Sequence, residues 1–277
     1  MKKNVLITGC SSGIGRSLAD SFHNRGYRVW ATARNKERIN DLAAKGIQIA
    51  ELDVTSEQQI EEVVRQIYDI DGHLDILVNN AGYGSMGPLL ETSARELEKQ
   101  FATNVFAPMS LIRLVGAAMC NRGQGTIVNI GSISGVFATP FSGSYCASKA
   151  ALNTLSDVLR MELKPFGVRV ITVQPGAVRS NFADNASKVV DRVMAKGSRY
   201  QTVEEGVRKR ARASQDNPTE TDFFCKQLID RIESGKASNI IRIANGSKLF
   251  PLLKACLPVA ILEKVLMKMF SLDKLKP

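Results

Sequence analysis

The chain has 277 residues, 44% of them hydrophobic, which suits one α/β domain over residues 1–277 with a sizeable core. A net charge of +10 is compatible with nucleic acid, an anionic membrane or a phosphorylated cofactor, so charge alone selects no partner. Five cysteines without CxxC spacing argue against a disulfide framework and against a metal site, and a reducing, cytoplasmic setting is expected.

Apolar runs of strand length alternate with segments long enough for helices. The runs are residues 5–8, 27–33, 47–54, 74–79, 126–130 and 168–174, with a seventh strand predicted at 239–244. The first run is too short for a signal-peptide core. Nearly continuous Val, Ile and Leu are typical of parallel strands covered on both faces. The pattern predicts a doubly wound (Rossmann) parallel sheet of about seven strands, with helices on both faces.

A glycine-rich turn follows the first predicted strand and opens the first predicted helix. It reads Thr-Gly-Cys-Ser-Ser-Gly-Ile-Gly over residues 8–15. Glycines there allow a tight turn and a close approach of the backbone, so that a pyrophosphate can lie at the positive end of the helix dipole. A plain strand-to-helix turn is the alternative, but it would need only one glycine. The sequence therefore predicts a dinucleotide site.

The end of the second strand indicates which dinucleotide is bound. An NAD-binding site carries an acidic residue there, which holds the ribose 2′-hydroxyl. Here the position has Ala33 followed by Arg34. A guanidinium can hold a 2′-phosphate in a charge-assisted fork, whereas a carboxylate would repel it. We expect NADP rather than NAD, with a solvated arginine after the strand as the alternative.

The helix predicted to begin near Tyr145 carries leucines at spacings of three and four, at 152, 155, 159 and 163, and ends before Pro165. This spacing predicts one apolar stripe to bury. Between residues 132 and 145, and again after residue 82, the chain supplies candidates for an apolar pocket. They are Phe137, Thr139, Phe141, Ser142, Gly143, Gly84, Met86 and Pro88.

Composition changes after about residue 180. Residues 181–220 are polar and basic, and either cover a substrate or form a solvated helical face. The basic residues are Lys188, Arg192, Lys196, Arg199, Arg208, Lys209, Arg210 and Arg212. Residues 245–277 form an apolar and basic C-terminal extension, too interrupted by lysines and prolines for a membrane span. It either packs on the core or rests on an anionic membrane surface.

Several motifs in one order resemble those of the short-chain dehydrogenase/reductase family, over nearly all of the first 180 residues. The motifs are TGCSSGIG at 8–15, Asp53 in LDVT, NNAG at 79–82, Asn104 in ATNVFA, Ser132 in NIGSISG, Tyr145 and Lys149 in YCASK, and Pro175-Gly176 with Ser180. The loop before Tyr145 and the tail are most similar to the hydroxysteroid and retinol dehydrogenases and to acyl-dihydroxyacetone-phosphate reductases.

The resemblance implies a catalytic tetrad of Asn104, Ser132, Tyr145 and Lys149. It also implies a homodimer or homotetramer formed through the helices that contain Asn104 and Tyr145. The residues expected at the dinucleotide are Gly9, Ser11, Ser12, Gly13, Ile14, Gly15, Arg34, Asp53, Val54, Asn80, Ala81, Gly82, Tyr145, Lys149, Pro175, Gly176, Val178 and Ser180.

The chemistry explains why such residues are needed. Carbonyl reduction delivers hydride to carbon while negative charge gathers on oxygen, so the site needs a proton donor there. Tyr145 is the candidate, and Lys149, four residues later on the same helix face, is expected to lower the pKa of its phenol. Ser132 would orient the carbonyl, and Asn104 would hold a water that links Lys149 to solvent. Each residue also has a purely structural alternative.

These expectations combine into an NADP(H)-dependent oxidoreductase that interconverts a carbonyl and an alcohol on a lipophilic substrate such as a steroid, retinoid or lipid ketone. The alternative from another class is a non-catalytic dinucleotide-binding regulatory protein, which would not need all four catalytic residues. Nucleic-acid binding through the basic segment is not expected, because no recognition motif accompanies the charge.

Overall fold

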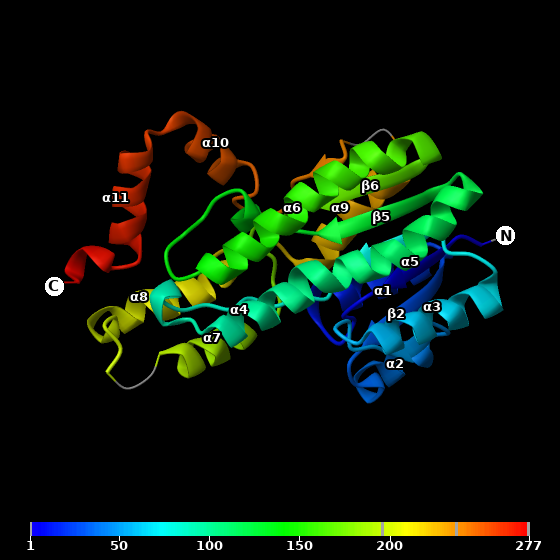
Figure 1. The fold of residues 1–277 in the computed structure, drawn as a ribbon, viewed down its shortest axis with the longest axis horizontal. Helices are drawn as coiled ribbons and strands as arrows, with labels where there is room; N and C mark the ends of the chain where they lie inside the picture. Colours follow the sequence, from blue (N-terminus) through cyan, green and yellow to red (C-terminus); the bar gives the residue numbers. More distant parts are fainter. Residues whose placement is uncertain (1, 195–196, 236–237, 276–277) are drawn as a thin grey trace.

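The computed structural model describes residues 2–194, 197–235 and 238–275, and it contains the predicted parallel sheet (Figure 1). The seven strands lie in the order β3-β2-β1-β4-β5-β6-β7, and all are parallel. Their bounds are β1 Asn4–Ile7, β2 Arg28–Ala33, β3 Gln48–Glu51, β4 Ile76–Asn79, β5 Gly125–Ile130, β6 Val168–Val173 and β7 Ile240–Ile241. The order reverses between β1 and β4, as in other doubly wound sheets.

Helices cover both faces of the sheet. One core lies between the sheet and α1, α2 and α9, and a second lies between the sheet and α3, α5 and α6. The helix bounds are α1 Gly13–Asn24, α2 Asn40–Ala43, α3 Glu57–Asp71, α4 Ala94–Phe101, α5 Ala107–Arg122, α6 Gly143–Leu163, α7 Phe182–Val193, α8 Glu204–Arg212, α9 Thr221–Glu233, α10 Leu249–Cys256 and α11 Val259–Met269. The predicted fold class is confirmed.

The predicted and observed strand ends differ most at β3 and β7. The strand predicted at residues 47–54 is the shorter β3, Gln48–Glu51, and the strand predicted at 239–244 is the shorter β7, Ile240–Ile241. Both are edge strands, so each has a partner strand on one side only. Backbone hydrogen bonds continue beyond the regular strands, for example from Gly176 N–H to the carbonyl of Ile243 and from Leu52 N–H to the carbonyl of Ala33. Apolar residues continue beyond both strands, which is why the pattern extended too far.

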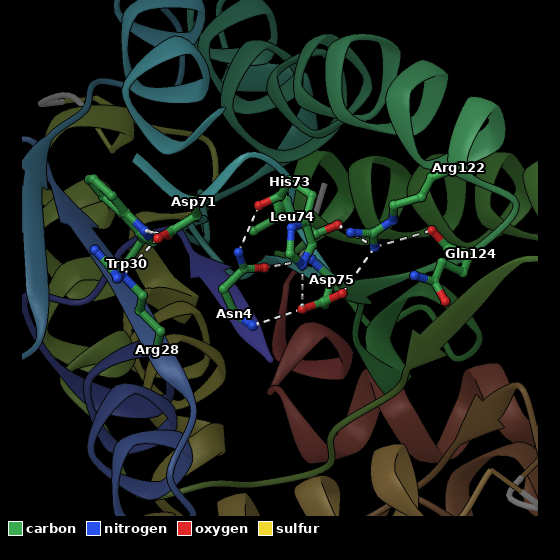
Figure 2. A network of polar contacts seen from close by, with 9 residues as sticks. All are labelled: Asn4, Arg28, Trp30, Asp71, His73, Leu74, Asp75, Arg122 and Gln124. Carbon is green, nitrogen blue, oxygen red and sulfur yellow. Dashed lines mark hydrogen bonds and ion pairs between the residues drawn. The ribbon is translucent and has the colours of Figure 1, made fainter. Parts of the chain in front are cut away.

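A polar network fastens the amino-terminal edge of the sheet (Figure 2). The backbone N–H of Asn4 donates to Asp75 at 2.9 Å, and the Asn4 amide donates to the carbonyl of His73 at 2.7 Å. Arg122, at the end of α5, forms an ion pair with the same Asp75 at 3.0 Å. Ligands of doubly wound sheets bind at the opposite, carboxyl edge, so this network is structural.

The buried face of α6 is more polar than its leucine spacing predicts. Of the four leucines only Leu152 is buried, and the other three are half-buried. The most enclosed positions are instead polar, among them Lys149 at 5% exposure and Ser156 at 0%. Polar side chains are buried at such cost only when they are hydrogen-bonded or functional.

Residues 181–220 make an excursion from the carboxyl edge of the sheet. The chain leaves near Val178, forms α7 and α8, and returns at Thr219, which bridges back to Val178. Residues 195–196, including the basic Lys196, lie outside the described residues. Apolar side chains of α7 and α8 join Tyr145 in a third cluster, separate from the two cores of the sheet. The excursion therefore lies over Tyr145.

The C-terminal extension packs on this excursion with one face and exposes the other (Figure 1). Leu266 and Phe270 are buried in the cluster that contains Tyr145, and Lys254 Nζ donates to the carbonyl of Val136 at 2.7 Å. The other face leaves apolar residues more than half exposed. They are Leu249, Leu252, Val259 and Ile261. Residues 276–277 lie outside the described part of the extension.

One helical stretch of the described chain, Ala94–Arg122, is long and apolar enough to cross a membrane by length and composition. It comprises α4, a π-helical turn and α5. Of its most apolar window, 44% is buried inside the chain, and Asn104 at its centre is fully buried and hydrogen-bonded. These features are those of a core helix.

Candidate active site

Two loops brace each other at the carboxyl ends of β1 and β4. Thr8 Oγ1 accepts hydrogen bonds from the backbone N–H groups of Asn80 and Ala81, both at 3.0 Å. The Asn80 amide donates in return to the carbonyl of Thr8 at 2.8 Å. Gly9 has φ +74°, and a Cβ there would lie 2.9 Å from Ala81 Cα. The glycine turn and the NNAG run thus form one rigid unit.

The first turn of α1 leaves its backbone N–H groups available. Ser12 occupies the N-cap, but its side chain accepts no capping hydrogen bond, and the turn contains no acidic residue. Gly13, with φ +57°, lies against Ser180, whose Cβ would be 3.1 Å from an added Cβ. The turn therefore lies next to the segment that follows β6, and its free donors suit a pyrophosphate.

The predicted tetrad converges on the carboxyl edge of the sheet. Lys149 Nζ donates to the carbonyl of Ile130, the last residue of β5, at 2.7 Å. A Cβ on Gly82 would lie 3.6 Å from that Nζ and 3.1 Å from Asn104 Oδ1. Glycine keeps this space open between the two side chains. Gly82 of the NNAG run, Lys149 and Asn104 therefore lie next to one another at the carboxyl edge of the sheet.

Asn104 lies in the π-helical turn Ala102–Phe106, a feature frequent at functional sites. Its amide donates to the carbonyl of Tyr83 at 3.0 Å and to Ser148 Oγ at 3.1 Å, and its Oδ1 accepts from Tyr83 N–H at 3.2 Å. The side chain thus supports the loop after NNAG and the helix of Lys149. The structural alternative for Asn104, a helix-interior polar group bonded to a neighbouring loop, describes these contacts with Tyr83, although no local pattern marks Tyr83 or Ser148 as the partners.

Ser132 follows β5 and begins a short 3-10 turn, Ile133–Gly135. Its Oγ accepts from the Ser134 N–H at 3.0 Å, and the next residue, Ile133, donates to the carbonyl of Pro175 at 3.0 Å. A Cβ on Gly176 would lie 1.8 Å from the carbonyl oxygen of Asn245. The predicted Pro-Gly motif is therefore held on one side by the extension of β7 and on the other by the Ser132 loop.

The pKa of Tyr145 corrects an expectation from the sequence. Burial raises it to about 12, against the lowering that Lys149 was expected to cause. Hydrogen bonding with Ser132 and the charge of Arg210 oppose the rise. Burial also lowers the pKa of Lys149 to about 8. Desolvation dominates both groups because neither side chain reaches bulk water.

Arg34 and Asp53 lie at the ends of the outer strands. Arg34 directly follows β2 and is exposed, and no ion pair engages it within the described ranges. Asp53 Oδ1 accepts from the N–H and hydroxyl of Thr55 at 2.9 and 2.7 Å. The next residue, Val54, is buried. Both side chains thus lie at the carboxyl edge of the sheet, and their contact with a dinucleotide stays a prediction.

Three of the eight candidate pocket residues lie in the cluster that contains Tyr145. Phe137, Phe141 and Met86 are buried in its cluster, and the ring of Phe182 lies 5.3 Å from the Tyr145 ring. Sequence reasoning treated Arg210 only as one of many basic residues. The structure buries it beside the loop that precedes Tyr145, where its Nε donates to Thr139 Oγ1 at 2.5 Å.

Comparison with known proteins identifies the class. The family model described as short chain dehydrogenase matches residues 3–191. The "Short-chain dehydrogenase cctT" of Talaromyces islandicus is 33% identical and aligns over 99% of this chain and 98% of its own length. A short-chain dehydrogenase structure from Streptomyces avermitilis gives a TM-score of 0.81 at 30% identity, covering 99% of this chain and 97% of that one. The closed form of serine dehydrogenase complexed with NADP+ gives 0.75 at 27%, covering 87% and 94%.

The chain therefore belongs to the short-chain dehydrogenase family of oxidoreductases. The fold and the glycine turn at its carboxyl edge agree with binding of a nicotinamide dinucleotide, NAD or NADP. The narrower resemblance to the hydroxysteroid, retinol and acyl-dihydroxyacetone-phosphate branch stays a prediction.

Proposed function

We propose that this protein is an NADP(H)-dependent oxidoreductase that interconverts the carbonyl and alcohol forms of a lipophilic substrate. The observation that carries the proposal is the convergence of Ser132, Tyr145 and Lys149 beside the glycine turn and under an apolar cluster. A regulatory protein that only binds a dinucleotide would not need to bury a tyrosine and a lysine at this cost.

The residues present fit a nicotinamide dinucleotide. The free N–H groups of α1 would receive the pyrophosphate, and Lys149, whose Nζ lies beside Gly82, would hold the nicotinamide ribose. The bound cofactor supplies or accepts the hydride at the substrate carbon. Arg34 supports NADP over NAD, because its exposed guanidinium can pair with a 2′-phosphate.

Tyr145 would donate the proton to the substrate oxygen in the reductive direction. With a pKa of about 12 the phenol is protonated at neutral pH, so it is ready to act as the acid. Ser132, hydrogen-bonded to that phenol, would hold the carbonyl oxygen next to it. The Lys149 ammonium would favour the phenolate left after proton transfer. Asn104 donates a hydrogen bond to Ser148, the residue before Lys149 in α6. We expect Asn104 also to hold a water that links Lys149 to solvent.

The pH dependence should differ between the two directions. Lys149 carries its charge below its pKa of about 8, and Tyr145 keeps its proton throughout the neutral range. We expect kcat/KM for reduction to be flat from about pH 6 to 7.5 and to fall above pH 8, and oxidation to rise with pH as the phenolate becomes accessible. Initial rates in both directions from pH 6 to 10 measure this. A reduction rate that rises between pH 7 and 9 would contradict the assignment.

The apolar cluster around Tyr145 supports a lipophilic substrate. An absorbance assay of NADPH consumption should cover ketosteroids, retinal, medium-chain ketones and acyl-dihydroxyacetone phosphate. We expect turnover of at least one lipophilic class, because Phe137 and Phe141 belong to the cluster that contains Tyr145 and the Phe182 ring lies 5.3 Å from the Tyr145 ring. Turnover confined to small polar ketones would refute this part of the proposal.

Two proposals concern partners. A homodimer or homotetramer through the helices of Asn104 and Tyr145 is supported by exposed apolar side chains there, with Phe106 60% and Met161 67% exposed. A monomeric mass by light scattering would refute it.

Peripheral membrane contact of an otherwise cytoplasmic protein is supported by the exposed apolar residues and lysines of α10 and α11. Failure to co-sediment with anionic vesicles would refute that one.

A further inference from the structure

Arg210 stands out from the other basic residues of α8. Its helix neighbours Lys209 and Arg212 are exposed, and Arg208 forms ion pairs with Asp191 and Glu204. Arg210 is only 8% exposed. Within the described ranges no carboxylate lies within 4.0 Å of its guanidinium. Arginines are rarely buried without a paired anion, because losing the hydration of the charge is costly.

The hydrogen bonds of Arg210 use only one edge of the guanidinium. Nε donates to Thr139 Oγ1 at 2.5 Å, and Nη2 reaches Ser134 Oγ at 3.5 Å. A guanidinium has five N–H donors, so both donors of Nη1 and one of Nη2 remain. Among the described residues no oxygen acceptor lies within hydrogen-bond distance of these three, while the thiol of Cys146 engages the guanidinium and the Tyr145 phenol lies within reach of its charge. The guanidinium therefore keeps donors that could pair with a carboxylate.

The position of this charge relates it to the substrate. Ser134 and Thr139 belong to the loop between Ser132 and Tyr145, and the charge of Arg210 acts on the Tyr145 phenol. Hydrophobic side chains of the cluster that contains Tyr145 pack around this loop. The Arg210 cation thus lies beside an apolar cluster and next to the predicted proton donor, on the side of Tyr145 where the excursion of residues 181–220 lies over it.

We propose that Arg210 binds a carboxylate of the substrate, so that the enzyme acts on an apolar oxo acid or the corresponding hydroxy acid. The inference rests on the proposed function and narrows its substrate. A carboxylate fits better than a phosphate monoester, because the guanidinium carries one positive charge and a phosphate monoester carries nearly two negative charges. The apolar cluster would hold the hydrocarbon body of the same molecule.

The test separates binding from turnover. Calorimetry of the NADP-loaded protein with decanoate and with decanol compares two ligands that differ in their charged end. We expect decanoate to bind about 10–100-fold more tightly, and Arg210→Met to remove that difference while decanol binding changes less than about threefold. Arg212→Met, an exposed arginine on the same helix, is the control and should leave both affinities unchanged.

Steady-state kinetics provide the second part of this test. A medium-chain oxo acid and its methyl ester are compared, and Arg210→Met should raise KM for the acid about 10–100-fold while the ester keeps its kcat/KM. Thermal melting and NADPH binding of the variant establish that it is folded. An equal loss of kcat/KM for the acid and the ester would show that Arg210 only positions the Tyr145 loop, and this would overturn the inference. Equal binding of decanoate and decanol by the wild type would also overturn it. In both cases carbonyl reduction itself would still stand, whereas absence of all NADPH consumption would refute the proposed function.

Discussion

Tyr145→Phe is expected to lower kcat for carbonyl reduction by about 10³-fold, within the range that general acid catalysis supplies. The substitution removes the phenolic proton and keeps the ring, which packs against Phe182 with centroids 5.3 Å apart. Affinity for NADPH should therefore stay within about threefold, measured by quenching of protein fluorescence. Loss of kcat without loss of cofactor binding identifies a residue that acts in the chemical step.

Tyr200→Phe is the matched control for this variant. Tyr200 belongs to the same apolar cluster, and its ring lies edge-on to that of Phe141, with centroids 6.0 Å apart. Removing its hydroxyl should change kcat by less than about threefold. Turnover of Tyr145→Phe near that of the wild type would exclude Tyr145 as the proton donor.

Arg34→Asp is expected to reverse the cofactor preference, with a change of about 10²–10³ in the ratio of kcat/KM for NADPH to that for NADH. The variant removes a cation that can pair with the 2′-phosphate, and it supplies a carboxylate that repels the phosphate but can accept from a 2′-hydroxyl. Arg34 is exposed at the end of β2, so the substitution should leave the fold intact.

Arg65→Asp, an exposed arginine on α3, changes net charge equally and controls for long-range electrostatics. It should leave the NADPH to NADH ratio unchanged. A wild type that prefers NADH, together with an unchanged ratio in Arg34→Asp, would contradict the assignment of NADP.

The sequence predicted the sheet because its strands are buried on both faces and read as continuous apolar runs. The candidate catalytic side chains also lie at the sheet edge where the sequence predicts them. Tyr145 and Lys149 share one helix face by their spacing of four, and the Ser132 loop follows β5 at the same edge. Glycines of the first turn have a packing reason that the spacing suggested, since Gly9 lies against Ala81.

Other features depend on contacts that are distant in the chain. The polar inner face of α6 is satisfied partly through Asn129, which donates to Ser156 Oγ at 2.9 Å, and no periodicity encodes such a pair. The high pKa of Tyr145 follows from how deeply α7 and α8 enclose it. For the same reason Arg210, in a run of similar charges, could not be separated from its solvated neighbours before its burial was known.

Transfer of deuterium from NADPH that carries deuterium at both C4 positions of the nicotinamide tests the central claim most directly. The reduction of a lipophilic ketone or oxo acid by the wild type should place the label on the carbinol carbon of the alcohol, as mass spectrometry of the product measures. Tyr145→Phe should bind the labelled cofactor and form almost no labelled alcohol. Label-free alcohol from the wild type, or full label transfer by Tyr145→Phe, would contradict the account.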